Sequence, residues 1–188
     1  MSTTISRSPG VPTGYPGLVA GGGYTGATKD LDDAVANAAE MLRAAYDMDV
    51  TIRFNSDRRS GGAWLVTSSE DRIGSNSDIG LSVRLVDVAD RRARAAKNKE
   101  RYGWEDDTDR MLLEDGFDPS KPPTHYLLFS SYIGNAALKD PATANAMTDD
   151  PNRRYASHSH ASTADALAFV QEHGQVPEDA LTASAPRI

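Results

Sequence analysis

The sequence has no cysteine among its 188 residues. A disulfide framework, a thiolate metal site and a cysteine nucleophile are therefore excluded. No apolar run approaches the roughly 18 residues that a membrane-spanning helix requires. The polar segment 1–8, in which Ile5 stands alone, does not resemble a signal peptide. These absences predict a cytoplasmic protein with no membrane association.

Lysine is scarce beside arginine, because the chain has 5 Lys, 15 Arg and 26 Ala. This bias is typical of GC-rich coding and indicates an actinobacterium or one of its phages as the source. In a phage, the protein would be located in the virion instead. The formal net charge of −7 at pH 7 argues against a protein that coats DNA, because phosphate neutralisation requires clustered positive charge.

Length and composition predict three segments. Residues 1–28 contain Pro9, Pro12, Pro16 and many glycines, and such a segment buries too little apolar area to fold alone. We expect it to be an arm that is flexible or bound to a partner. Residues 29–175 are predicted to form a single α+β domain, and residues 176–188 a frayed tail.

Apolar periodicity predicts the elements of that domain. An apolar stripe with period 3.6 indicates a helix over 29–46 that Thr28 caps, and a helix capped by Ser162 or Thr163 is expected to end at His173. Alternating or apolar runs indicate four strands, at 50–55, 63–68, 79–85 and 125–131. Two further helices are expected at 88–101 and 104–114. Short connections favour an antiparallel meander of about four strands, with the first and last helices packed on one face.

The glycine-rich run Gly21–Gly26 matches the pattern G-x-G-x-x-G through Gly21, Gly23 and Gly26. The surrounding LVAGGGYTGAT resembles the opening of flavin and nicotinamide oxidoreductases, which implies a dinucleotide on a helix N-terminus. The context argues against it, because only 18–20 precedes the motif as a strand and the strands that follow are meander-like. We therefore predict no cofactor and keep these glycines as a candidate nucleotide-binding site.

His158 and His160 are the candidate metal ligands, because residues i and i+2 of a strand share one face. Neutral imidazoles suit zinc or a similar transition metal. A third ligand would have to come from His125, Asp165 or His173, and the spacing selects none of them. The alternative is that both histidines lie in a solvated loop.

A basic stretch within 88–101 is the candidate nucleic-acid-binding segment, since arginine and lysine contact phosphates. Its candidate residues are Arg91, Arg92, Arg94, Lys97 and Arg101. Acidic residues within the stretch, and the run 105–109 after it, nearly cancel its charge. A solvated helix face is the alternative interpretation.

No serine-hydrolase or zinc-protease motif occurs in the sequence. We therefore favour a non-enzymatic interaction protein, such as a phage-type accessory or assembly subunit. Its arm and its polar loop 134–152 would become ordered on a protein partner or by self-association. The alternative is a protein or enzyme that binds a nucleotide or nucleic acid through the 91–101 segment and the two histidines.

Overall fold

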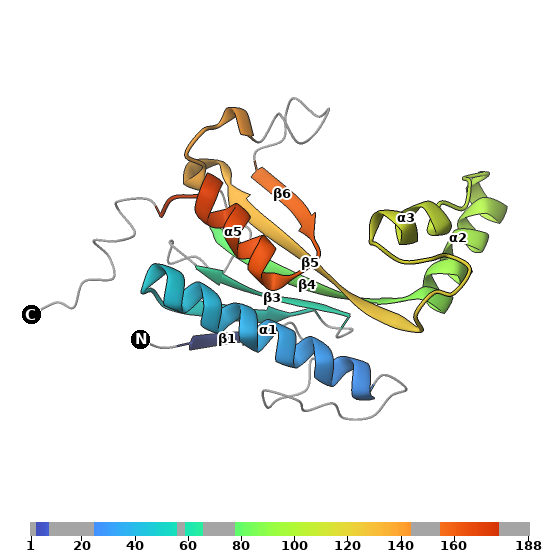
Figure 1. Cartoon of the computed structure of the whole chain (residues 1–188), viewed down its shortest axis with the longest axis horizontal. Coiled ribbons are helices and arrows are strands. Elements are labelled where there is room, and N and C mark those ends of the chain that lie inside the picture. Colours follow the sequence, from blue (N-terminus) through green and yellow to red (C-terminus); the bar gives the residue numbers. More distant parts are fainter. Residues whose placement is uncertain (1–2, 8–24, 56–58, 66–77, 144–154, 177–188) are drawn as a thin grey trace, which may run out of the picture.

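The computed structural model of the protein describes residues 3–7, 25–55, 59–65, 78–143 and 155–176, with only the backbone described over 3–7 and 25–30. Figure 1 shows a twisted sheet with two helices, α1 (Thr25–Tyr46) and α5 (Thr163–His173), on one face. Two further helices, α2 (Val88–Tyr102) and α3 (Thr108–Glu114), extend from one end of the sheet. The predicted α+β class is confirmed.

The sheet contains six strands in sequence order. They are β1 (Thr3–Arg7), β2 (Val50–Phe54), β3 (Ser60–Leu65), β4 (Ile79–Asp87), β5 (His125–Gly134) and β6 (Tyr155–His160). Strands β2–β6 form the predicted antiparallel meander, whereas β1 pairs in parallel with β2. The prediction of about four strands is therefore too low, and the chain contains one β–α–β unit that the prediction omitted.

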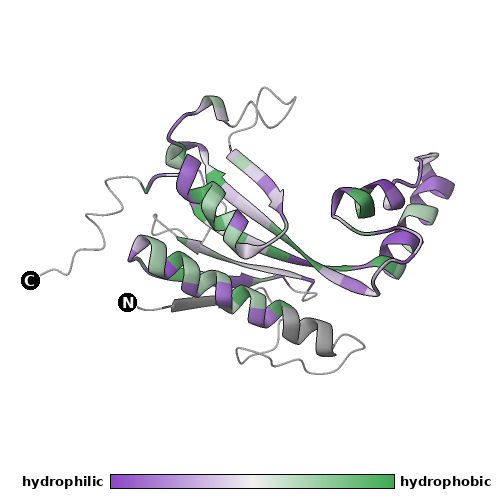
Figure 2. Cartoon of the chain, viewed as in Figure 1, coloured by the Kyte–Doolittle hydropathy of each residue, from purple (hydrophilic) through white to green (hydrophobic). Residues whose placement is uncertain are grey.

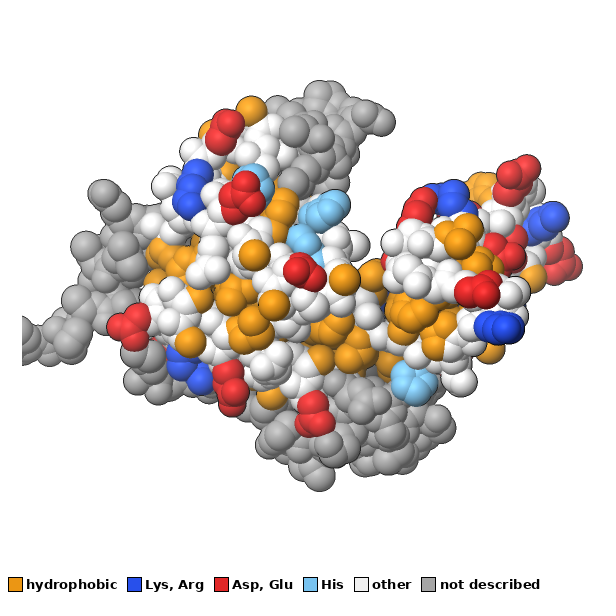
Figure 3. All heavy atoms as spheres, in the orientation of Figure 1, with side chains coloured by type: hydrophobic (Ala, Val, Ile, Leu, Met, Phe, Trp, Pro, Cys, Tyr) orange, Lys and Arg blue, Asp and Glu red, His pale blue; other side chains and the backbone are white. Residues whose placement is uncertain are grey.

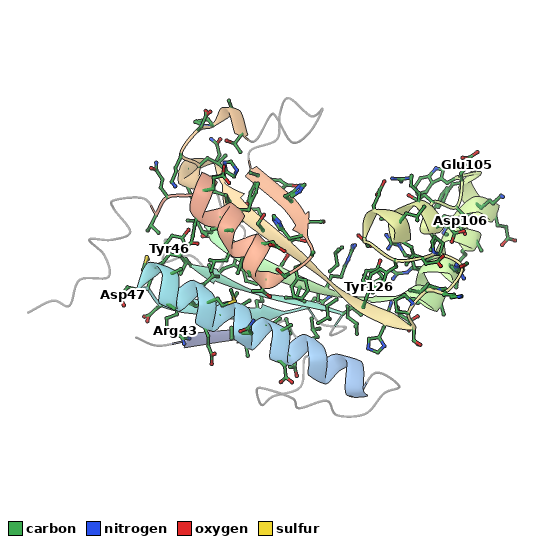
Figure 4. The ribbon with its side chains drawn as sticks, in the orientation of Figure 1. Arg43, Tyr46, Asp47, Glu105, Asp106 and Tyr126 are labelled. Carbon is green, nitrogen blue, oxygen red and sulfur yellow. The ribbon has the colours of Figure 1, made fainter. Side chains whose placement is uncertain are left out.

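Helix α1 forms because an apolar residue recurs at nearly every helical turn. Leu31, Val35, Ala38 and Leu42 are fully buried and face the sheet. The helix begins at Thr25, so Thr28 lies inside it rather than capping it. After Tyr46 the chain takes a left-handed conformation at Asp47, with φ of 53°, and the Asp47 N–H donates to the Arg43 carbonyl at 2.9 Å. Figure 4 shows these three residues at the end of the helix.

The main core lies between the sheet and the two helices α1 and α5. It contains the inward-facing residues of β2 to β4, including Ile52, Phe54 and Leu81, together with Val170 of α5. Figure 3 shows further hydrophobic side chains at the surface over the middle of the molecule. Of the two predicted caps, Ser162 is the one that caps α5, because its hydroxyl accepts the Asp165 N–H at 3.2 Å.

Residues 88–124, which we call the helical excursion, replace a tight turn between β4 and β5. The Asp87 side chain caps α2 by accepting the Asp90 N–H at 3.0 Å. Gly103, at φ of 72°, ends α2 with a hydrogen bond to the Lys99 carbonyl of 2.9 Å. Figure 2 shows that α2 is mostly hydrophilic, as expected for a helix that buries little besides Val88.

Helix α3 begins later than the predicted residue 104. The Asp106 carboxylate accepts the Thr108 N–H at 2.9 Å, and this turn sets the helix start at Thr108. Hydrogen bonding to Thr108 lowers the pKa of Asp106. Glu105 and Asp106 thus lie at the outer end of the excursion, and Tyr126 lies at its base on β5 (Figure 4).

A second apolar cluster holds the excursion on the sheet. Val86 and Tyr126, from the ends of β4 and β5, pack with Val88 and Leu112, and Phe117 covers them. The Tyr126 hydroxyl donates to the Asp115 carboxylate and accepts from Arg91 at 2.8 Å. Burial, followed by the hydrogen bond to Asp115, raises the pKa of Tyr126 to about 12.

Much of the predicted arm lies outside the described residues. The predicted tail also does, except for its first residue. The arm segment 8–24 is not described, whereas 3–7 form β1 and 25–28 belong to α1. Tail residues 177–188 are likewise not described. The three-segment division therefore stays a prediction. Within the described part of the chain, no helix is both long enough and apolar enough to cross a membrane.

Candidate functional site

The sheet face opposite α1 and α5 carries a continuous polar row. Strand pairing places Arg53, Gly62, Ser82, Ser130 and Ser159 side by side across β2 to β6. Their side chains are short except at the arginine end. Arg53 and the three serines of this row line a hollow of about 550 Å³.

Trp64 lies flat along one side of this hollow. A β-carbon on Gly80, its partner on β4, would collide with the five-membered part of the indole. A β-carbon on Gly62 would collide with the far end of the six-membered ring. The indole therefore rests on the bare backbone of two glycines, and it lines the hollow. Covering a strand glycine with a neighbouring aromatic ring also stabilises the sheet.

Two arginines of the hollow have no acidic partner among the described residues. Arg53 is half-buried and Arg84 is exposed, and both line the same cavity. In the described part of the chain, neither guanidinium forms an ion pair with a carboxylate. Guanidinium groups bind phosphate and carboxylate oxygens in a bidentate manner. The hollow is therefore suited to an anion.

A second hollow, of about 340 Å³, continues the first toward the helical excursion. Asn55, Ser60 and Arg84 line both hollows. The second one adds three arginines, Arg59, Arg91 and Arg94. We call the two hollows together the arginine groove.

The charges of the arginine groove are only partly neutralised. Asp90 pairs with both Arg59 and Arg94, at 2.5 and 2.7 Å. Asp115 lies 3.5 Å from Arg91. Among the described residues, Asp90 and Asp115 are the carboxylates that pair with these guanidinium groups, so the described lining of the groove carries more positive than negative charge.

The predicted basic segment contributes only part of this surface. Arg91 and Arg94 line the groove, whereas Arg92 pairs with Asp109 at 3.1 Å. Arg101 lies over the Tyr102 ring at 5.3 Å. Lys97 is exposed on α2 and does not line the groove.

Sequence reasoning missed Arg53, Arg59 and Arg84. Arg53 and Arg84 occupy the polar positions of alternating strands, which was the available signal. Their convergence depends on the register of β2, β3 and β4, which the sequence does not reveal.

The two candidate metal ligands do lie together on β6. Their ring centroids are 5.0 Å apart, and both rings contact Phe169 of α5 on the helix-covered face. The His160 Nε2 atom lies 2.9 Å from the hydroxyl of the fully buried Ser131. Burial, and then the charge of His158, lower the pKa of His160, while Asp165 opposes this shift. These surroundings therefore favour the neutral form of His160.

The structure does not complete a metal site around this pair. His125 lies at the opposite end of β5, His173 packs on Phe169 with a centroid distance of 4.5 Å, and Asp165 accepts from Ser162 at 2.7 Å. Within the described ranges, no three His, Asp or Glu side chains are placed to hold a metal ion. Figure 3 shows histidine side chains beside a notch that separates the sheet from the excursion.

The glycine motif cannot be placed as a site. Gly21 and Gly23 lie outside the described residues, and of Gly26 the structure describes only its helical backbone in α1. The nucleotide-binding prediction for these three glycines therefore stays a prediction. Comparison with known proteins finds no family model, no curated protein and no solved structure that matches this chain.

Proposed function

We propose that the protein is a non-enzymatic binding protein whose arginine groove holds the phosphate backbone of a nucleic acid. The observation that carries this proposal is that Arg53 and Arg84 lie in one hollow and pair with no carboxylate in the described part of the chain. When arginines of this kind neutralise phosphates, counterions are released from the nucleic acid, and this release favours binding. The acidic remainder of the chain repels phosphate and so confines binding to the groove.

The test is the affinity of a fluorescein-labelled oligonucleotide, measured by anisotropy over a series of salt concentrations. The double variant Arg53→Gln, Arg84→Gln is expected to bind about tenfold more weakly or worse. Its salt slope should fall by about 1.5, because two phosphate contacts are lost. Circular dichroism confirms that the variant is folded.

A matched control removes the same charge elsewhere. Arg110 and Lys121 are exposed residues of the excursion that do not line the groove. The variant Arg110→Gln, Lys121→Gln should keep the wild-type affinity. Equal weakening in both double variants, or no binding by the wild type at low salt, would contradict the proposal.

The second candidate function is docking to a protein, and a different surface favours it. Among the residues that the structure describes, three of the four exposed large hydrophobic residues lie on the excursion, namely Tyr102, Trp104 and Leu113, with Trp104 being 62% exposed. The rings of Tyr102 and Trp104 are 5.0 Å apart. Exposed tryptophan and tyrosine are frequent anchors of protein interfaces. An accessory or assembly subunit, as the sequence predicts, would use such a surface.

Self-association through this surface is testable with the protein alone. Sedimentation velocity over a range of concentrations should show association of the wild type, and Trp104→Ser should abolish it. Deleting residues 1–24 is a poorer test of a docking arm, because it also removes β1. A wild type that stays monomeric at every concentration would reject self-association.

A further inference from the structure

We infer that the nucleic acid held by the arginine groove is single-stranded, and that one of its bases stacks on Trp64. This inference rests on the proposed function. It adds the strandedness of the ligand and the residue that recognises an unpaired base.

The rows of the open sheet face separate aromatic groups from charged groups. Trp64, Gly80 and Tyr132 form one row across β3 to β5, and Tyr155 of β6 stacks on Tyr132 at 5.3 Å. The next row contains Arg53 and the serines, and the row beyond it places Arg84 opposite Ser60. A strand lying across the sheet would therefore meet rings on one side and cations on the other.

The placement of the arginines indicates which side takes the phosphates. Arg53 and Arg84 lie in the two rows beyond the Trp64 row, and both line the first hollow. The backbone of the strand is thus expected on the Arg53 and Arg84 side, with its bases over Trp64.

The indole is fixed in place before any ligand arrives. Gly62 and Gly80 let it lie against the backbone, so little side-chain entropy is lost when a base stacks on its outer surface. Stacking on a protein ring requires an unpaired base, because duplex bases are already stacked on one another. This geometry favours a single strand over a duplex.

The first experiment uses tryptophan fluorescence. The chain has 2 Trp, so Trp104→Phe leaves Trp64 as the only tryptophan. An unlabelled oligothymidylate should quench the emission of this variant, whereas a DNA duplex should not. Thymidine monophosphate is tested separately. If it quenches the emission at similar concentrations, the site is a nucleotide pocket and the inference of strand binding is wrong.

The second experiment separates stacking from charge. Trp64→Leu should weaken single-strand binding about tenfold or more while leaving the salt slope unchanged, because the phosphate contacts remain. Trp64→Phe keeps a ring over the glycines and should restore most of the affinity. Circular dichroism of each variant checks that the sheet is intact.

The outcomes distinguish this inference from the function on which it rests. If duplex binds as tightly as single strand and Trp64→Leu changes neither affinity, the stacking inference is wrong and the groove remains a phosphate site. If no nucleic acid binds, both fail. Binding of polyglutamate in place of the oligonucleotide would instead indicate an acidic protein partner and overturn the inference.

Discussion

Replacing Phe54 with alanine is expected to lower the free energy of unfolding by about 3–5 kcal/mol. Phe54 is the largest fully buried side chain in the described ranges and belongs to the core beneath α1 and α5. Its ring lies over Gly61 of the neighbouring strand, where a β-carbon would come within 2.5 Å of the ring. The substitution therefore leaves a cavity and also uncovers a glycine in the middle of the sheet.

Urea denaturation followed by circular dichroism measures this effect. Leu113→Ala is the matched control, because Leu113 is 63% exposed and its truncation should change the stability by no more than about 0.5 kcal/mol. A loss below about 1 kcal/mol for Phe54→Ala would show that the ring is not packed as described.

Replacing Arg91 with methionine is expected to destabilise the helical excursion by about 2–3 kcal/mol. Arg91 is mostly buried, and it links the Tyr126 hydroxyl at 2.8 Å with the Asp115 carboxylate at 3.5 Å. Methionine has a similar length, so the main loss is the hydrogen-bonded charge. Asp115 then remains partly buried without its cation, which is the costly consequence of removing one partner of an ion pair.

Hydrogen exchange measures which part of the chain loses stability in Arg91→Met. Amides of 88–124 should exchange faster in Arg91→Met, while those of β2 and β3 should keep their protection, because the excursion has an apolar cluster of its own. Arg92→Met is the control, since Arg92 pairs with a largely exposed Asp109 and such pairs contribute little. Equal acceleration in both variants would contradict the role of Arg91.

The local pattern of the sequence predicts the elements that bury an apolar face. The stripe Leu31, Val35, Ala38 and Leu42 indicates α1, and the alternation in 79–85 indicates β4. The serine that caps α5 is one of the two caps that the sequence predicts. In each of these elements the pattern within the segment and the burial in the fold agree.

The strand segments that the sequence did not predict are stabilised by neighbouring strands and side chains. Strand β6 buries only Ala156 of its six residues, so it has no apolar alternation, and pairing with β5 accounts for its extended backbone. Gly61 and Gly62 indicated a turn, because glycine is unfavourable in strands. They lie inside β3 because Phe54 and Trp64 cover them from opposite faces.

The candidate site was harder to predict than the fold. The basic segment predicted a nucleic-acid-binding surface on α2. Of its five candidate residues, Arg91 and Arg94 line the groove, whereas Arg92 pairs with Asp109. The groove depends on Arg53 and Arg84, which lie on two strands separated by β3. Only the register of three strands shows that these residues share one hollow.

The long connection between β4 and β5 also affects how the chain folds. These strands form nine residue pairs, from Ile79 with Ile133 to Asp87 with His125, yet residues 88–124 separate them. Loop-closure entropy rises with the length of the connection, so this is the antiparallel pairing with the largest closure cost. Early winding of α2 and α3 shortens the effective loop, which couples the rate of closure of β4 on β5 to local helix propensity.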